Sequence, residues 1–554
     1  MYGFIVSKKL PSQHPDIKYN DYEFTNNLIK KFGKDKIFKE TEQYVVIIDG
    51  VILNKSKLLG NDLDWCEKVI ELYKENGETF FSAFRGIFSG ALYDKKQDKL
   101  IVFSDQIGQK FIFYWHDKES FIASSMLPSV YEELKSNNIK YTLSEEGAIQ
   151  LLSYGYMLGN STLSAEIKKI RPGCYIVLEN GNLTEKEYYH LSNKPIYGRS
   201  EDEIIEELDR LFKEAVRLQF EKDKEYGYKH ICELSAGLDC RIVSFAAHEL
   251  GYTDQLNITF SQNDYWDDIV PKKMAADMRH EWIFKSLNNG LWLYNIDTIT
   301  RTTGGNVIYH GSAHAYSLYR CLEFNEFGIL HSGNLGGALL GCQFEDNNAP
   351  FVKGCGAFAD KYLKYIKSYL TYDNAEIGMW YVRYLNGIDA GQQIVFNYTE
   401  TFAPYLDLDF MEYCLSIPCN LRADKLRLFK KWILKKYPQA AKYVWERFGA
   451  RIDAPMIKIG RRHIPIEAIP KRLINYTARK LGFKDKDASI KSMNPVAYYL
   501  QTNEELRKYL EDYLSSAKIN NRRIQQIIND IRINGSAMEK IEAISLISAI
   551  KLYF

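Results

Sequence analysis

The sequence predicts an α/β fold with a β-rich N-terminal domain and a C-terminal domain built on a doubly wound parallel sheet with a helical C-terminal part. Three observations predict it. Short β-branched and aromatic runs fill the first two hundred residues, strands and helices alternate after residue 200, and the last two hundred residues are mainly helical. Because 554 residues exceed one ordinary domain, we expect domains at 1–195 and 200–554, with the boundary near 192–200.

Short strands separated by turn residues dominate the N-terminal part. β-branched and aromatic runs predict strands at 44–53, 88–94, 99–105, 110–115 and 120–125. Residues 173–189 indicate a further hairpin that turns at Asn180-Gly181, since this dipeptide tolerates the positive φ angles of a tight hairpin turn.

The pattern changes after residue 200. Apolar residues recur every three or four positions from 200 to 221, which predicts a helix. Apolar strands are then expected at 230–234, 256–260, 281–284 and 328–334, and helices at 241–250, 267–278, 424–437 and 541–554. Strand–helix alternation of this kind indicates a parallel, doubly wound sheet.

Composition excludes several classes of protein. The formal net charge of +1 offers no basic surplus for nucleic acid and no charge excess for a membrane surface. Nine scattered cysteines without a CxxC pair argue against a disulfide framework or a zinc cluster and favour a reducing cytoplasm. The N-terminus lacks the apolar core of a signal peptide, and no uninterrupted apolar window of about twenty residues predicts a membrane span.

The turn SAGLDCR, residues 235–241, lies between a predicted strand and a predicted helix. Open α/β sheets bind ligands at such turns, where loop N–H groups and a helix N-terminus attract anions. Asp239 would repel a phosphate unless a cation lay between them, which suggests Mg²⁺. The alternative is an ordinary βα turn in which Asp239 caps the helix, and spacing alone does not decide between them.

Five segments resemble the asparagine synthetase family. SAGLDCR resembles its SGGxDS pyrophosphate loop, with Ala236 at the first glycine and Cys240 at the second serine. The other segments resemble, in order, the glutaminase-domain motif, the adenine-contacting strand, the second nucleotide loop and the PFLD motif, at residues 84–114, 257–268, 329–341 and 403–418. The segments keep the family order and cover nearly the whole chain.

The resemblance implies an Ntn-hydrolase-like αββα domain followed by a PP-loop synthetase domain that uses ATP and Mg²⁺. It implies a metal ligand at Asp239 and catalytic roles for Asn334 and Arg447. The positions that it implies for ATP binding are Leu234, Ser235, Ala236, Gly237, Leu238, Asp239, Cys240, Arg241, Thr259, Phe260, Ser261, Ser332 and Gly333.

The N-terminal pattern departs from the family at its nucleophile. Family members that hydrolyse glutamine begin Met-Cys-Gly, and the N-terminal amine activates the thiol. Here Tyr2 precedes Gly3, and a phenol of pKa about 10 does not replace a thiol of pKa about 8.5. We therefore expect a domain without glutaminase activity, as in the family's β-lactam synthetases and lasso-peptide cyclases.

The nucleotide loops depart from the family as well. Gly337 stands where the family's second loop carries a metal-binding Asp. Glu345 or Asp346, further along the chain, would be the residues to supply the missing carboxylate. Asn334 stands at a position that often carries Glu or Tyr, and an amide is no general base at neutral pH. Arg447 is the best match to the basic residue that contacts the pyrophosphate in the family. Lys430 and Lys431 are expected on a solvated helix face.

The histidine pair His310 and His314 has the spacing of one helix face. A zinc site would need a third ligand, so we expect this segment to line the acyl or amine pocket instead. Asp407 is expected to cap a helix.

These expectations describe an ATP-dependent amide-bond-forming enzyme that works through an acyl-adenylate and releases AMP and pyrophosphate without hydrolysing glutamine. Its substrate would be a small molecule or peptide that supplies a carboxylate and an amine. A homodimer is the expected assembly, and no nucleic-acid or membrane partner is expected. The alternative is a catalytically silent homologue that binds a nucleotide or a partner protein.

Overall fold

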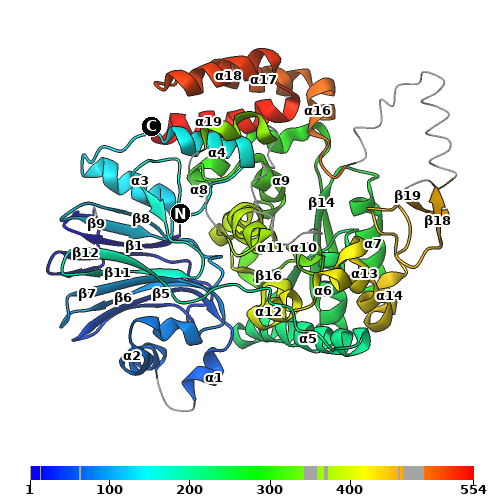
Figure 1. Cartoon of the computed structure of the whole chain (residues 1–554), viewed down its shortest axis with the longest axis horizontal. Helices are drawn as coiled ribbons and strands as arrows, with labels where there is room; N and C mark the ends of the chain where they lie inside the picture. The colour runs from blue at the N-terminus through cyan, green and yellow to red at the C-terminus, as the bar shows by residue number, and fades with distance from the viewer. Residues whose placement is uncertain are drawn as a thin grey trace.

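The computed structural model describes residues 2–12, 14–60, 64–341, 359–366, 372–459, 462–466, 469 and 492–554. Two antiparallel sheets fill the N-terminal part (Figure 1). The first has the strand order β10 (Lys168–Lys169), β8 (Phe113–His116), β9 (Phe121–Ser124), β1 (Gly3–Lys8), β3 (Tyr22–Asn27), β2 (Ile17–Tyr19). The second has the order β12 (Asn182–Glu187), β11 (Cys174–Glu179), β7 (Lys99–Ser104), β6 (Gly86–Asp94), β5 (Tyr44–Ile52), β4 (Ile37–Glu40).

Helices cover both outer faces of these sheets, which gives the predicted αββα layers. The apolar face of α2 (Trp65–Asn76) packs on the second sheet, next to α1 (Lys55–Leu59) and η1 (Gly77–Ala83). On the other side α3 (Leu127–Ser136) and α4 (Glu145–Tyr154) cover the first sheet. The predicted hairpin forms between β11 and β12, and Asn180 and Gly181 take the expected positive φ angles.

The C-terminal half is built on a five-stranded parallel sheet. Its strand order is β15 (Glu281–Ser286), β14 (Gln255–Ser261), β13 (Lys229–Glu233), β16 (Phe327–His331), β17 (Thr401–Phe402). The chain adds β14 and β15 on one side of β13 and then returns to add β16 and β17 on the other. This order places a topological switch point between β13 and β16, where α/β sheets bind their ligands.

Helices surround the parallel sheet, and the first of them is longer than predicted. Helix α5 begins after a Ser200–Glu203 capping box and continues to Tyr226. The other helices near the sheet are α6 (Leu238–Glu249), α7 (Trp266–Met278), α8 (Ile296–Thr303), α9 (His310–Tyr319), α10 (Gly336–Leu339), α11 (Ala375–Met379), α12 (Leu408–Leu415), α13 (Cys419–Lys436) and α14 (Pro438–Ala441). Shorter helical segments are η2 (Asn288–Tyr294), η3 (Phe324–Glu326), η4 (Ala359–Tyr365), η5 (Trp380–Ile388), η6 (Asp389–Asn397) and η7 (Pro404–Leu406).

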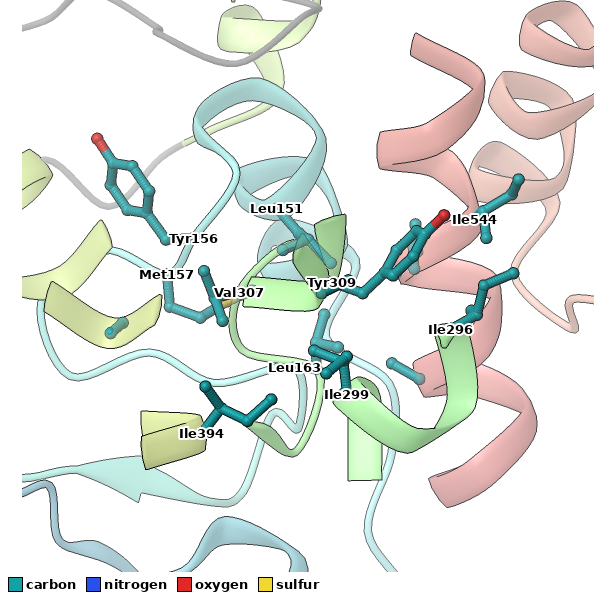
Figure 2. Packing of buried hydrophobic residues seen from close by; sticks show 14 of the residues in the cluster. Leu151, Tyr156, Met157, Leu163, Ile296, Ile299, Val307, Tyr309, Ile394 and Ile544 are labelled. Carbon is teal, nitrogen blue, oxygen red and sulfur yellow. The ribbon is translucent and has the colours of Figure 1, made fainter. Parts of the chain in front are cut away.

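The chain ends in α16 (Val496–Thr502), α17 (Glu504–Ser515), α18 (Arg522–Asn534) and α19 (Ala537–Tyr553), after a hairpin of β18 (Met456–Ile459) and β19 (Arg462–Pro465). These last helices return to the N-terminal part. Figure 2 shows Leu163 beside Ile299, and Tyr309 between Leu151 and Ile544, so one apolar cluster joins segments from both halves of the chain.

Two further observations bear on the sequence analysis. No helix in the described ranges is long and apolar enough to cross a membrane. Of the cysteines described, Cys419 is disulfide-bonded, a bond that the scattered cysteine pattern did not predict. The free thiols are Cys66, Cys174, Cys232, Cys240, Cys321 and Cys414.

Candidate active site

Two loops meet at the switch point of the parallel sheet. Strands β13 and β16 are hydrogen-bonded neighbours, with Cys232 opposite His331. The first loop follows β13 and leads into α6, and the second follows β16 and leads into α10. Both predicted nucleotide loops therefore lie at the carboxyl ends of adjacent parallel strands, where loop N–H groups and the N-terminus of α6 face the same space.

A cavity of about 650 Å³ opens between these loops. Most of the residues predicted from the sequence line it, and they come from segments more than two hundred residues apart. The predicted residues that line the cavity are Ser235, Gly237, Leu238, Asp239, Cys240, Phe260, Ser332, Gly333, Asn334 and Arg447.

The two loops touch through backbone atoms. A Cβ at Gly333 would lie 2.2 Å from the backbone nitrogen of Cys240, so only glycine allows this approach. The backbone N–H of Gly337 donates a 2.8 Å hydrogen bond to Asp239 Oδ2. Asp239 therefore joins the first loop to the second, and its alternative assignment as the cap of α6 is wrong, because Gly237 holds the N-cap position.

Burial dominates the electrostatics of Asp239. Removal from water raises the pKa of this carboxyl to about 6, although the Gly337 N–H favours the ionised form. A nearby cation would favour the ionised carboxylate, which is the form that binds Mg²⁺.

Five predicted nucleotide contacts lie outside the cavity lining, and the clearest of them is Arg241. Its side chain is fully buried, and the guanidinium donates to the carbonyl oxygens of Ala236, Ala440, Tyr443 and Val444. Arg241 therefore anchors the first loop to a distant segment, and its side chain does not line the cavity.

Leu234 and Ala236 are also buried behind the loop. The backbone N–H of Ala236 is already bound to Asp267 Oδ1 at 2.7 Å, so it is not available to a phosphate.

On β14, only Phe260 of the predicted adenine contacts lines the cavity. Thr259 Oγ1 donates to the carbonyl oxygen of Leu234 and accepts from Trp282 Nε1, which links β14 to the base of the first loop. Ser261 is buried, and its hydroxyl has no hydrogen-bond partner within the described residues.

Asn334 has a partner that the sequence did not reveal. Its Nδ2 donates to Asp389 Oδ1 at 3.1 Å, and its backbone N–H donates to Ser332 Oγ. Burial raises the pKa of Asp389 to about 7, with a further contribution from the charge of Asp105. The Asn334 amide is thus held by a buried carboxylate close to its protonation midpoint at neutral pH.

Two more acids in the cavity lining were missed. Glu233 accepts hydrogen bonds from Ser332 Oγ and Tyr319 OH at 2.6 and 2.8 Å. Glu446 also lines the cavity, and burial together with the charge of Asp267 raises its pKa to about 7. In the sequence, Glu446 stands directly before Arg447 in VWER, but the residues that surround it in the fold are distant in sequence.

The histidine pair lies on α9, and Gly311, Ser312, His314 and Ala315 of this segment line the cavity. That this wall is the acyl or amine pocket stays a prediction. Burial lowers the pKa of both His310 and His314, which keeps them neutral.

Asp223, His230 and His331 bring ligand-type atoms together elsewhere. Both imidazoles lie 2.8 Å from Asp223 Oδ2, the separation of hydrogen bonds, so this cluster binds its members to one another.

Three other sequence predictions have simple outcomes. Asp407 caps α12 by accepting from the Phe410 N–H, as expected. Lys431 pairs with Glu201 at the surface, which agrees with a solvated face. Glu345 and Asp346 lie outside the described residues.

Comparisons with known proteins agree with this architecture. Residues 29–189 match the family model described as "Glutamine amidotransferase domain". "Asparagine synthetase [glutamine-hydrolyzing] 1" of Bacillus subtilis (strain 168) is 25% identical over 268 residues, covering 46% of this chain and 41% of that protein.

Two further relatives are similar over shorter or weaker matches. "Putative asparagine synthetase [glutamine-hydrolyzing] 2" of Methanocaldococcus jannaschii is 23% identical, covering 41% of this chain and 46% of that protein. "Amidase chry2" of Gibberella zeae is 29% identical, covering 35% and 27%. The chain thus spans less than half of the length of each of these relatives. It carries a glutamine amidotransferase domain and has homologues among the asparagine synthetases.

Proposed function

We propose that the chain forms amide bonds at the expense of ATP, through an acyl-adenylate and without hydrolysing glutamine. The observation that supports this most is the meeting of two loops across one cavity at the switch point of the sheet, with the Asp239 carboxylate between them. Such a site combines helix and loop N–H groups for phosphates with a carboxylate for a divalent cation.

The residues present suit Mg²⁺ as well as ATP. Asp239 Oδ2 is bound by one N–H, and Glu446 Oε2 is a buried carboxylate oxygen without a hydrogen-bond partner in the described part of the chain. Mg²⁺ prefers oxygen ligands and is held by one or two carboxylates together with substrate phosphates. A bound Mg²⁺ would neutralise charge on the phosphates, and the Arg447 guanidinium in the cavity wall would add to this effect.

The proposed chemistry has two steps. A substrate carboxylate oxygen attacks the α-phosphorus of ATP, and the bond to pyrophosphate breaks. An amine then attacks the acyl carbon, AMP leaves, and the amine proton passes to a base. Asn334 would orient the amine through its Oδ1, because its Nδ2 is already committed to Asp389.

The far side of the cavity would select the substrate. Arg383 and Ile388 line it with exposed side chains, beside Gln392 and the N-terminal part of α9. We propose a small molecule or peptide that supplies a carboxylate and an amine. The homodimer and the division into domains at 1–195 and 200–554 stay predictions.

Product analysis with free ammonia, hydroxylamine or glutamine as nitrogen source tests this function. Aspartate and a panel of carboxylic acids serve as substrates with ATP and Mg²⁺. The proposal expects AMP and pyrophosphate with ammonia or hydroxylamine and no glutamate released from glutamine, because Tyr2 stands at the nucleophile position. ADP and phosphate as products would contradict the acyl-adenylate route, and glutamate release would contradict glutamine independence. A protein that binds no nucleotide at all would support the silent homologue instead.

A further inference from the structure

The second nucleotide loop has no carboxylate to place beside Asp239. Gly337 occupies the position closest to it, and a Cβ there would lie 3.3 Å from Asp239 Oδ2. The Gly337 N–H already binds that oxygen. Side-chain space at residue 337 is therefore limited by Asp239, and a second cation ligand has to come from another wall of the cavity.

Glu446 lies in such a wall. A turn holds it between Trp445 and Ala450, in which the Trp445 N–H donates to the Ala450 carbonyl and Gly449 donates back to the Trp445 carbonyl. Gly449 has a φ of 65°, which suits glycine and fixes the turn. Trp445, Glu446 and Arg447 all line the cavity, so the turn presents its residues to the two nucleotide loops.

One oxygen of the Glu446 carboxylate has no hydrogen-bond partner in the described part of the chain. This atom, Oε2, is buried. The nearest large cation on the first loop, Arg241, is committed to four backbone carbonyls. Arg241, Asp267 and Asp239 all lie close enough for their charges to act on the Glu446 carboxylate, and only Arg241 acts with the opposite sign. A buried carboxylate oxygen without a hydrogen-bond donor is costly unless a cation pairs with it.

We propose that Glu446 is a metal ligand that, together with Asp239, completes the divalent-cation site of the nucleotide pocket in place of the carboxylate absent at Gly337. This inference rests on the proposed function, since the remaining ligands would be phosphate oxygens of ATP.

The proposal predicts that metal and nucleotide bind cooperatively. Asp239, Asp267 and Glu446 do not meet the spacing of a three-ligand metal group in the described residues. Two carboxylates alone hold Mg²⁺ weakly, and phosphate oxygens complete its six-coordinate shell. Mn²⁺ should therefore bind poorly to the protein alone and well to the protein–nucleotide complex.

The test measures ATP affinity by calorimetry, with and without Mg²⁺, and Mn²⁺ binding by electron paramagnetic resonance. The variants are Glu446→Gln and Asp239→Asn, and Asp453→Asn is the matched control. Asp453 lies seven residues further along the same segment, is 42% exposed, and pairs with Arg451 outside the cavity lining. Thermal melting confirms that each variant folds.

In the wild type, Mg²⁺ should tighten ATP binding. Glu446→Gln should reduce this Mg²⁺-dependent increase in ATP affinity by about tenfold or more, because removing even a residue that supports a metal ligand has an effect of at least this size. Metal-free ATP affinity should stay equal or rise in Glu446→Gln, because a negative charge near the phosphates is removed. Asp453→Asn should behave as the wild type.

The inference fails if Glu446→Gln keeps the full Mg²⁺ dependence while Asp239→Asn loses it. Absence of ATP binding by the wild type, with or without metal, would overturn the proposed nucleotide site itself. The wild-type titration thus separates failure of the proposed function from failure of the role of Glu446.

Discussion

Asp389 is the residue whose titration the structure predicts most directly. Burial, followed by the charge of Asp105, raises the pKa of this carboxyl from 3.8 to about 7. The folded protein therefore holds a proton that the unfolded chain releases at lower pH. The free energy of unfolding then falls as pH rises from about 4 to about 7. Above the folded-state pKa the full loss caused by ionising the buried Asp389 carboxyl is reached.

Replacing Asp389→Asn should remove this cost. We expect the difference in free energy of unfolding, variant minus wild type, to be about 4 kcal/mol higher at pH 8 than at pH 4. Urea unfolding across this range measures it, with Asp409→Asn as the control because its side chain is 69% exposed. If the difference in free energy of unfolding between variant and wild type does not change with pH, burial does not raise the pKa of Asp389.

Gly333 tests whether the two loops must touch. Its Cβ would meet the backbone of Cys240 at 2.2 Å, and backbone atoms cannot move aside cheaply. Gly333→Ala should lower the free energy of unfolding by about 1–3 kcal/mol and weaken ATP binding. Gly311→Ala is the control, since that glycine lines the same cavity and its Cβ would meet its nearest neighbour at 4.0 Å. Equal behaviour of the two variants in urea unfolding would show that the loop contact is dispensable.

At the scale of elements, a buried ion cluster joins the antiparallel sheets to the parallel one. Glu400, just before β17, lies 2.9 Å from Lys36 Nζ and 3.0 Å from Lys110 Nζ. Asp49 on β5 completes the cluster, 3.2 Å from Lys110 Nζ. The two lysines hold the pKa of Glu400 well below its ordinary value, despite burial.

The sign of the pH effect is opposite to that of Asp389. A depressed carboxyl pKa contributes stability above the unfolded-state value, and this contribution is lost as pH falls below about 4.3. Glu400→Gln should cost about 3–5 kcal/mol at neutral pH, since it leaves two buried lysines with one acid, and should flatten the acid limb of the stability curve.

Chemical unfolding from about pH 7 down to pH 3 measures both effects. Glu326→Gln is the control, because Glu326 pairs with Lys229 at the surface and is 64% exposed. An acid limb that stays as steep in Glu400→Gln as in the wild type would show that other groups govern it.

Elements were predictable where the pattern is local. The alternation of apolar strands and amphipathic helices from 200 to 284 identified β13, β14, β15 and their helices, because period-2 and 3.6-residue patterns survive packing. The Asn180-Gly181 hairpin was predictable for the same reason.

The fine structure of the site was not predictable. Arg241 was assigned to the cavity because it lies two residues after Asp239, yet residues two apart on a helix point in different directions, and Arg241 is buried in the interior. Asp389 and Glu446 approach the loops only through tertiary packing, across 55 and more than two hundred residues. No sequence spacing could have indicated either.

At the scale of the whole molecule, one apolar core crosses between the halves of the chain. Buried residues of α4, α8 and α19 belong to a single cluster, and Figure 2 shows Ile544 of α19 close to Ile296. In Figure 1 the C-terminal helices lie across the top of the molecule, where α19 packs against α4 of the N-terminal part and against α8 and α9 of the C-terminal part. We therefore expect the halves to unfold together.

Ile544→Ala should lower the free energy of unfolding by about 2–5 kcal/mol, because it leaves a cavity in this shared core. Ile533→Ala on the neighbouring helix α18 is the control, since Ile533 is 72% exposed and its loss should cost less than about 0.5 kcal/mol. Calorimetry should show one transition that moves to lower temperature in Ile544→Ala. Two separate transitions, with only one of them shifted, would contradict a shared core.

The central claim is that the meeting loops bind ATP through a divalent cation held at Asp239. Calorimetric titration of ATP into the full chain, with and without Mg²⁺, tests it most directly when Asp239→Asn is titrated in parallel. We expect Mg²⁺-dependent binding by the wild type that Asp239→Asn loses, while the melting temperature of the variant does not fall. Equal ATP binding by both proteins, or none by the wild type at millimolar ATP, would contradict it.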